Sequence, residues 1–155
     1  MIRKLTLLLL ATPLMLRADD AAAKLATRGI AEFTAAYQAW DGGRFGTAAE
    51  WFRQAGAKDP GASVNFYWQG AARFHRMIQL RGLAASAADT KAAAAAMDEA
   101  VVALETALRL DPKHAGSHAL LGTLYGMKIN GSKALAEHPA DHTAKDGLAR
   151  VTQAK

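Results

Sequence analysis

The residues with the clearest capacity for chemistry are two pairs of histidines with helical i, i+4 spacing: His114 with His118, and His138 with His142. On a helix this spacing places both imidazoles on one face, where they could ligate zinc. However, His114 closely follows Pro112 at an expected helix start, and Pro139 interrupts the second pair. No glutamate lies between either pair to act as a base, and the chain has no cysteine. We therefore predict no metal site.

Two further catalytic motifs lack the context that their chemistry requires. The glycine-rich stretch 42–46 is expected between two helices, whereas a phosphate-binding loop follows a strand. The serines do not stand in a nucleophile elbow, the strand-to-helix turn that exposes a catalytic hydroxyl; they are Ser63, Ser86, Ser117 and Ser132. We predict that the protein is not an enzyme and needs no cofactor, so its function must lie in the surfaces that its elements form.

These elements are most clearly defined between Met97 and Tyr125. Small and large apolar residues recur there with helical spacing, first at Ala100, Leu104, Ala107 and Leu108, and then at Leu121, Gly122 and Tyr125. Pro112 cannot continue the first helix, because it has no N–H group and its ring clashes with the preceding turn. The pattern predicts two helices joined by a tight turn at 111–112. Abundant alanine and few β-branched residues extend this prediction to an all-α protein.

The same spacing of residue types occurs before two different prolines. Counted back from Pro60, the residues are Ala55, Phe52, Ala48, Phe45 and Gly43; counted back from Pro112, they are Ala107, Leu104, Ala100 and Met97. Alanines at such positions let a neighbouring helix approach closely, while the large side chain between them fills the core. We therefore predict all of these residues to be core.

This repeated pattern resembles the tetratricopeptide repeat (TPR) family, whose helical hairpins carry Leu-Gly, an aromatic residue, Ala-x-x-x-Phe and a terminal Pro. The resemblance covers about Ile30 to Tyr125, and the sequence departs from the family at Glu32, where Trp is usual. A long insertion in the middle repeat is similar to that of small exported bacterial repeat proteins. The family resemblance implies antiparallel helical hairpins stacked as a short right-handed solenoid of about two and a half repeats, at 29–60, 62–112 and 115–146. The third repeat lacks the aromatic, the later Ala and the Pro.

The middle repeat carries an insertion. Pro60 and Pro112 lie 52 residues apart, as do Gly70 and Gly122, whereas the repeat period is 34 residues. The surplus falls at about 76–96, in helix-forming sequence on both sides of a break at 82–89. We expect both helices of this hairpin to be lengthened by about two and a half turns, with Ser86 or Asp89 as a cap. A mobile low-complexity loop is the alternative, because the alanine run 92–96 buries little surface.

The pattern also predicts helices at both ends of the mature chain. Residues 19–40 form the first, with Asp19 or Asp20 as N-cap, a bend or break at Gly29 and a stop at 41–43. Towards the C-terminus we expect a turn at 130–132, a short helix at 133–137 and a last helix from Asp141 to Val151. Its inward residues would be Ala144, Leu148 and Val151. A divergent helix of this kind would cap the exposed end of a stack of repeats.

Residues 1–18 have the layout of a secretory signal peptide. Two basic residues precede an apolar run at 5–16, which is shorter than the roughly 20 residues needed to span a bilayer. We expect cleavage near Ala18 and a single domain at 19–155 in a bacterial periplasm or outside the cell; an uncleaved N-terminal anchor is the alternative. Cleavage would remove three of the 19 basic residues and leave 16 against 14 acidic ones, so a nucleic-acid partner is not expected.

The family resemblance implies that the first helix of each repeat lines a concave groove for partner segments. The matching positions are Phe33, Tyr37, Trp40 and Asp41, then Tyr67, Ala71, Phe74 and His75, and finally Ala119, Thr123 and Met127. Among them we predict these partner-binding residues: Phe33, Tyr37, Trp40, Asp41, Tyr67, Phe74 and His75. The stretch 65–68 agrees, because aromatic residues around a whole helix circumference suit an interface. Packing of these rings between repeats is the alternative.

Together these features predict an exported interaction module that binds a protein or peptide partner in an aromatic groove. No nucleic acid is expected and, after cleavage, no membrane. The alternative function is a small-ligand carrier, in which the long middle hairpin closes over the groove to form a pocket. Neither interpretation sets an oligomeric state.

Overall fold

The chain folds into five α-helices in a computed structural model that describes residues 12–82 and 85–137. The helices are α1 (Thr12–Ala39), α2 (Gly42–Lys58), α3 (Ser63–Leu80), α4 (Ala87–Leu110) and α5 (Ala115–Glu137). Within these residues there is no strand, so the all-α prediction is confirmed. None of the helices described is long and apolar enough to cross a membrane.

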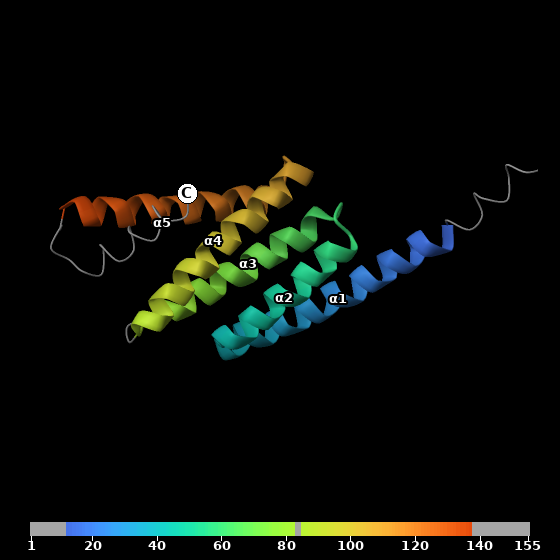
Figure 1. Cartoon of the computed structure of the whole chain (residues 1–155), viewed down its shortest axis with the longest axis horizontal. Coiled ribbons are helices and arrows are strands. Elements are labelled where there is room, and N and C mark those ends of the chain that lie inside the picture. Colours follow the sequence, from blue (N-terminus) through green and yellow to red (C-terminus); the bar gives the residue numbers. More distant parts are fainter. Residues whose placement is uncertain (1–11, 83–84, 138–155) are drawn as a thin grey trace, which may run out of the picture.

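Each helix packs on the next one along the chain, and α3 also touches α5 (Figure 1). The turns that join the helices are short, which makes neighbouring helices antiparallel. The turn at 111–112 is present as predicted, because α4 ends at Leu110 and α5 begins at Ala115. As a result, the odd-numbered helices α1, α3 and α5 contribute to a common face.

Two apolar clusters hold the helices together. The first joins α2 to α3 around Phe52, with Phe33 of α1 packed against it, and the second joins α3, α4 and α5 around Met77, Leu104 and Leu124. The predicted core positions are fully buried except Met97, which packs half-buried against the second cluster, and Gly43, whose placement in the core is wrong because it is exposed in the first turn of α2. The buried ones are Phe45, Ala48, Phe52, Ala55, Ala100, Leu104 and Ala107. The burial of these apolar positions of α2 and α4 is therefore confirmed.

The middle hairpin is helical where the alanine run stands, so the alternative of a mobile loop there is wrong. Ala93 and Ala96 are buried in the second cluster. The two helices of this hairpin are α3, with 18 residues, and α4, with 24, whereas α2 has 17. The extra length therefore falls mainly on α4 rather than equally on both helices. Ser86 caps α4 as predicted, because its hydroxyl accepts the Asp89 N–H at 3.1 Å while the Asp89 carboxylate accepts the Ser86 N–H at 3.0 Å.

In the full chain, which still carries residues 1–18, the predicted N-cap at Asp19 or Asp20 is wrong. α1 begins at Thr12 and runs through both residues. Pro13 follows Thr12 directly, and a proline is tolerated in the first turn because its missing N–H would have no helical partner there. Asp20 instead forms an ion pair with Lys24, one turn further on, at 2.7 Å.

Two expected breaks inside helices are also wrong. α1 continues through Gly29, which is buried; a Cβ there would lie 2.8 Å from the ring of Phe52, so this glycine makes room for the ring instead of bending the helix. α5 continues through the turn expected at 130–132 and ends at Glu137. A helix that continues keeps its backbone hydrogen bonds, whereas a stop would leave four carbonyl groups to be satisfied.

Three sequence predictions lie outside the described residues. They are the basic and apolar start of the signal segment at 1–11, the second histidine pair, and the capping helix from Asp141 to Val151.

Candidate binding groove

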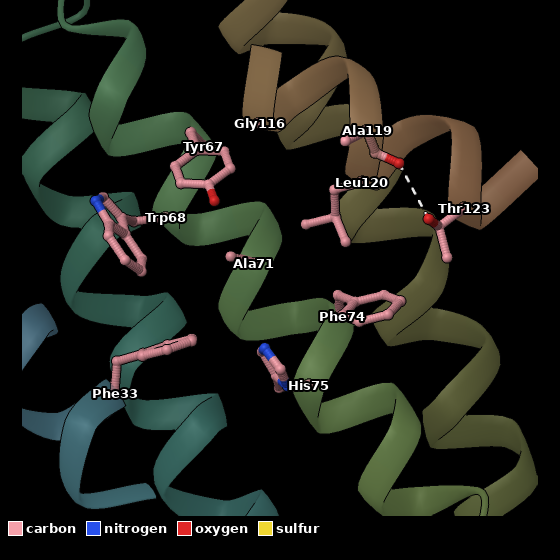
Figure 2. A pocket seen from close by; sticks show the side chains of 10 residues that line it. All are labelled: Phe33, Tyr67, Trp68, Ala71, Phe74, His75, Gly116, Ala119, Leu120 and Thr123. Atoms are coloured by element: carbon pink, nitrogen blue, oxygen red, sulfur yellow. Dashed lines mark hydrogen bonds between the residues drawn. The ribbon is translucent and has the colours of Figure 1, made fainter. Parts of the chain in front are cut away.

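Residues from α1, α3 and α5 line an open groove with a volume of about 430 Å³. Figure 2 shows Phe33 and Trp68 on one side of it, Phe74, Leu120 and Thr123 on the other, and the small residue Ala71 between them. The lining residues are Phe33 from α1, then Tyr67, Trp68, Ala71, Phe74 and His75 from α3, and Gly116, Ala119, Leu120 and Thr123 from α5. The groove therefore depends on the helices that the chain brings to one face.

The structure brings together most of the residues that the sequence placed on this face. Phe33, Tyr67, Phe74 and His75 line the groove, and so do Ala71, Ala119 and Thr123. Met127 packs instead against the second apolar cluster. Tyr67 approaches the start of α5 closely: a Cβ on Gly116 would lie 2.9 Å from its ring, and the His114 ring lies 4.7 Å away. Glycine at 116 thus lets α5 seat against α3.

Sequence reasoning missed Trp68, Gly116 and Leu120 as lining residues. The repeat register names only the positions that point outward from the middle of each first helix, whereas these three lie at the sides of the groove. Trp68 contributes to the core at the same time, because its ring lies 5.3 Å from Phe33 and stacks on Phe52 at 6.0 Å. The run of aromatics at 65–68 was the signal that could have found it.

His75 stands at the centre of a cluster of aromatic rings from three helices. Its ring centroid lies 5.4 Å from Phe33, 5.5 Å from Tyr37, 6.3 Å from Trp40, 5.2 Å from Phe45 and 5.5 Å from Phe74. Its Nδ1 is buried and has no hydrogen-bond partner among the described residues. Burial lowers the pKa of His75 below its ordinary 6.5, because the surrounding rings give the imidazolium nothing in place of water. The imidazole is therefore neutral at pH 7.

Tyr37 and Trp40 were also predicted to bind the partner, but they are not among the residues that line the groove. We call them its rim because both rings contact His75, which does line it. Their side chains are 58% and 48% exposed, and their rings contact each other and His75. Trp40 is the first residue after α1 and has a φ of 52°, a left-handed conformation that a bulky residue rarely adopts. Its ring packs against Phe45 at 6.0 Å, so contact with α2 and α3 accompanies the strained backbone.

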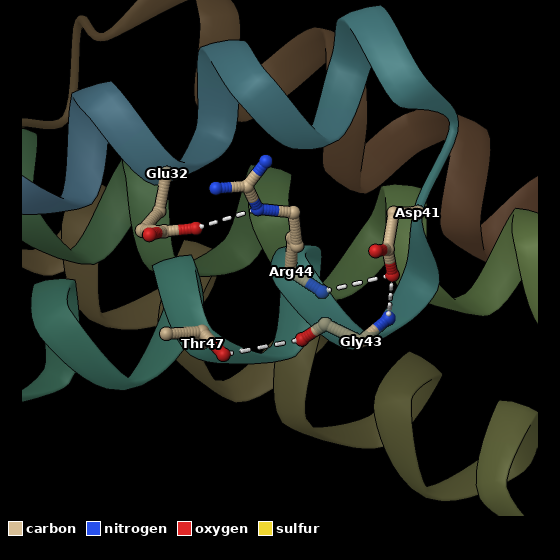
Figure 3. Close-up of polar contacts among 5 residues, drawn as sticks. All are labelled: Glu32, Asp41, Gly43, Arg44 and Thr47. Atoms are coloured by element: carbon tan, nitrogen blue, oxygen red, sulfur yellow. Dashed lines mark hydrogen bonds and ion pairs between the residues drawn. The ribbon is translucent and has the colours of Figure 1, made fainter.

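Asp41 has a structural contact and does not line the groove. Its carboxylate accepts the N–H groups of Gly43 at 2.8 Å and Arg44 at 3.2 Å, which caps α2 (Figure 3). The side chain of Arg44 turns back to Glu32 on α1, with Nε 3.1 Å from the carboxylate. Glu32, the departure from the family pattern, therefore ties α1 to the start of α2.

The charged side chains near the groove contact other parts of the protein. Arg73 of α3 forms an ion pair with Glu99 of α4 at 2.7 Å, although the two groups are not aligned as a hydrogen bond. Arg76 lies against α2, where a Cβ on Gly46 would collide with its guanidinium. No lysine, arginine, aspartate or glutamate stands among the residues that line the groove. Its surface is consequently made of rings, small side chains and one neutral imidazole.

The first histidine pair is engaged in the turn before α5. Nδ1 of His114 accepts the N–H of Ser117 at 3.1 Å, and Nε2 of His118 lies 2.8 Å from the carbonyl oxygen of Pro112. Ser117 is fully buried, and its hydroxyl lies 3.0 Å from the same Nδ1. In the described part of the chain, no three His, Cys, Asp or Glu side chains come together as metal ligands would.

Comparisons with protein-family models, with curated proteins and with solved structures gave no match.

Proposed function

We propose that the protein is an exported interaction module whose groove holds an apolar segment of a partner protein. The observation that carries this proposal is the groove itself, in which three separate helices supply an uncharged surface of rings and small residues. Ile30 and Val64 extend it, since they stand one turn before Phe33 and Tyr67 and are 40% and 48% exposed. Contiguous exposed apolar surface with aromatic anchors is typical of protein interfaces.

We further propose that the five helices are two and a half TPR-like hairpins of a short right-handed solenoid, with the expected helix 141–151 as its cap. Equivalent positions support this arrangement: Phe52 and Leu104, each eight residues before its proline, are both fully buried. α1, α3 and α5 would then be the first helices of successive repeats. That relation accounts for a groove built from these three helices.

Export is proposed from the N-terminal segment. Cleavage near Ala18 would leave α1 starting at Asp19, where Asp19 or Asp20 would cap the shortened helix. Ala22 is buried and lies after the cleavage site, so the shortened helix would still contain this buried residue.

The open groove favours a protein segment over an enclosed small molecule. Small-molecule sites bury most of the ligand surface. Here the lining comes from α1, α3 and α5, and none of the described residues at the tip of the α3–α4 hairpin is among the lining residues. For this reason we prefer the interaction module to the small-ligand carrier.

The proposal is tested by site-specific photocrosslinking in the cell that makes the protein. A photoreactive amino acid at Thr123, on the groove wall, should yield one reproducible protein adduct. The same amino acid at Val102, which is 64% exposed on α4 and does not line the groove, is the matched control and should not. Trp40→Gly should weaken the Thr123 adduct. The same adduct from both positions, or none from Thr123, would contradict the proposal.

A further inference from the structure

The groove offers very few polar atoms to a bound chain. Only four of its lining side chains contain nitrogen or oxygen: Tyr67, Trp68, His75 and Thr123. The Thr123 hydroxyl already donates to the carbonyl oxygen of Ala119 at 3.0 Å, and Nδ1 of His75 is buried within the ring cluster. This leaves the Tyr67 hydroxyl, the indole N–H of Trp68 and Nε2 of His75 as side-chain groups that a bound chain could reach. The main-chain groups of the lining helices are hydrogen-bonded within those helices, apart from N–H groups in the first turn of α5, which include that of Gly116. A bound segment therefore meets mostly rings and small side chains, with a few isolated hydrogen-bonding groups and no charged or amide side chain.

This scarcity discriminates between the shapes that a bound segment could take. An extended chain carries free N–H and C=O groups on both edges, and those turned toward the rings would lose water without gaining a partner. An α-helix has already paired its own backbone groups and presents only side chains. Helices that dock in apolar grooves do so through anchors at i, i+3, i+4 and i+7. The lining chemistry thus favours a helix over an extended peptide.

Charge restricts the docking face of that helix. The nearby cations already have anionic neighbours or lie against other helices: Arg73 with Glu99, Arg44 with Glu32, and Arg76 beside Gly46. A charged side chain pressed into the groove would lose its hydration and find no counter-ion. The face that enters the groove should therefore be apolar and free of charge.

We propose that the occupant is an amphipathic α-helix of a partner protein, docked by an apolar, uncharged face. This inference rests on the proposed function and specifies the chemistry of the partner. The small residues Ala71, Gly116 and Ala119 leave room above the groove floor, and the anchors of the helix would fill it between Trp68 on one side and Phe74 on the other (Figure 2).

Three synthetic peptides of about 14 residues, roughly four helical turns, provide the test. The first places Leu at i, i+3, i+4 and i+7, with Lys and Glu on the opposite face. The second has the same composition with Leu at alternate positions, and the third replaces one central Leu of the first by Glu. Calorimetry on the full chain gives each Kd, and circular dichroism reports helix formation on binding. The first peptide should bind at least about tenfold more tightly than either other peptide and gain helix.

Two matched variants separate the possible failures. Thr123→Glu charges the groove wall and should abolish binding, whereas Val102→Glu places the same charge on the exposed face of α4 and should leave the Kd unchanged. If the alternating peptide binds as tightly as the helical one and Thr123→Glu removes its binding, the helix inference is wrong while the groove function stands. If no peptide binds, or Thr123→Glu has no effect on binding, both proposals are overturned.

Discussion

Trp40 combines a strained backbone with ring contacts at the rim of the groove. Its φ of 52° is a conformation that costs a residue with a Cβ about 1–2 kcal/mol and glycine almost nothing. Trp40→Gly would remove this strain together with the ring, whereas Trp40→Ala would lose the ring and keep most of the strain. We predict that Trp40→Gly melts a few degrees above Trp40→Ala. Thermal unfolding of the two variants measures the difference, and equal melting temperatures would show that the backbone here is unstrained.

Both Trp40 variants should weaken partner binding to a similar extent, because both lack the ring that contacts Tyr37 and His75. Stability and binding are therefore expected to separate at this residue. Trp40→Gly is the better variant for binding measurements, since relief of the backbone offsets part of the lost packing.

His75 should make stability depend on pH. Its pKa in the folded protein lies below the ordinary 6.5, because burial among five rings disfavours the imidazolium. Between the folded and unfolded pKa values the unfolded chain binds more protons, so the free energy of unfolding decreases as the pH falls below about 6.5. Above that pH both states are neutral, and the contribution of His75 is constant.

The corresponding prediction compares the wild-type chain with His75→Phe, which keeps an aromatic ring against Phe33 and Phe45. The melting temperature of the wild-type chain should fall more steeply between pH 7.5 and pH 5 than that of the variant. Parallel pH profiles for the two proteins would mean that another group is responsible. The groups that pack on His75 are rings from α1, α2 and α3, so no neighbouring carboxylate is expected to reverse the sign.

At the scale of the elements, the two glycines that the sequence predicts at equivalent repeat positions have different surroundings. A Cβ on Gly70 in α3 would lie 2.6 Å from Cγ of Leu104 and 3.2 Å from the carbonyl oxygen of Ala100, whereas a Cβ on Gly122 in α5 would meet none of the described residues within 4 Å. Gly70→Ala should therefore destabilise the protein by about 1–3 kcal/mol. Gly122→Ala should stabilise it by up to about 1 kcal/mol, because alanine is the better helix former.

Urea denaturation of the two variants measures this contrast. If Gly122→Ala proves as damaging as Gly70→Ala, the face of α5 around Gly122 is covered in solution, and the description of α5 as open on that side is wrong.

The sequence was most informative about α2 and α4, because large and small residues alternate there at fixed distances from a proline. Phe52 and Leu104 could be placed in the core from that pattern alone. The continuity of α1 could not, since propensity treats Gly29 as a weak point and only tertiary packing shows that Phe52 needs the space. The helix propensity of the alanine run was recognised, but not that α4 would receive most of the added length.

The groove was predictable only in part. Phe33, Tyr67, Phe74 and His75 were predicted because they match the groove-facing positions of the repeat family that the sequence resembles. Trp68, Gly116 and Leu120 depend on how α1, α3 and α5 approach one another, which no single helix encodes. The left-handed conformation of Trp40 was equally hidden, because a turn of this kind normally carries glycine or asparagine.

At the scale of the whole molecule, the exposed large apolar residues divide between two regions. Ile30, Tyr37, Trp40 and Val64 belong to α1, the turn that follows it and α3, whereas Val102, Leu110, Tyr125 and Ile129 belong to α4 and α5. Two polar contacts tie α4 to α5 in the second region: the Tyr125 hydroxyl donates to Glu105 at 2.6 Å, and Lys128 pairs with Asp98 at 2.8 Å. The bond to Glu105 raises the pKa of Tyr125.

This division separates the proposed interface from the rest of the apolar surface. The first region continues into the uncharged groove, so binding there can anchor a partner on three helices at once. The second lies beside charged pairs on α4 and α5 and supplies control positions, of which Val102 is the most exposed.

The most direct test of the account is to map where the helical peptide binds, using amide chemical shifts of the full chain. We predict that the shifts that change on titration will cluster at Ala71, Phe74, Ala119 and Thr123, with Tyr37 and Trp40 at the rim and no change at Val102 or Thr106 on α4. Trp40→Gly should reduce the affinity while leaving the same residues affected. Shift changes centred on α4, or spread evenly over the molecule, would contradict the claim that α1, α3 and α5 form one binding groove.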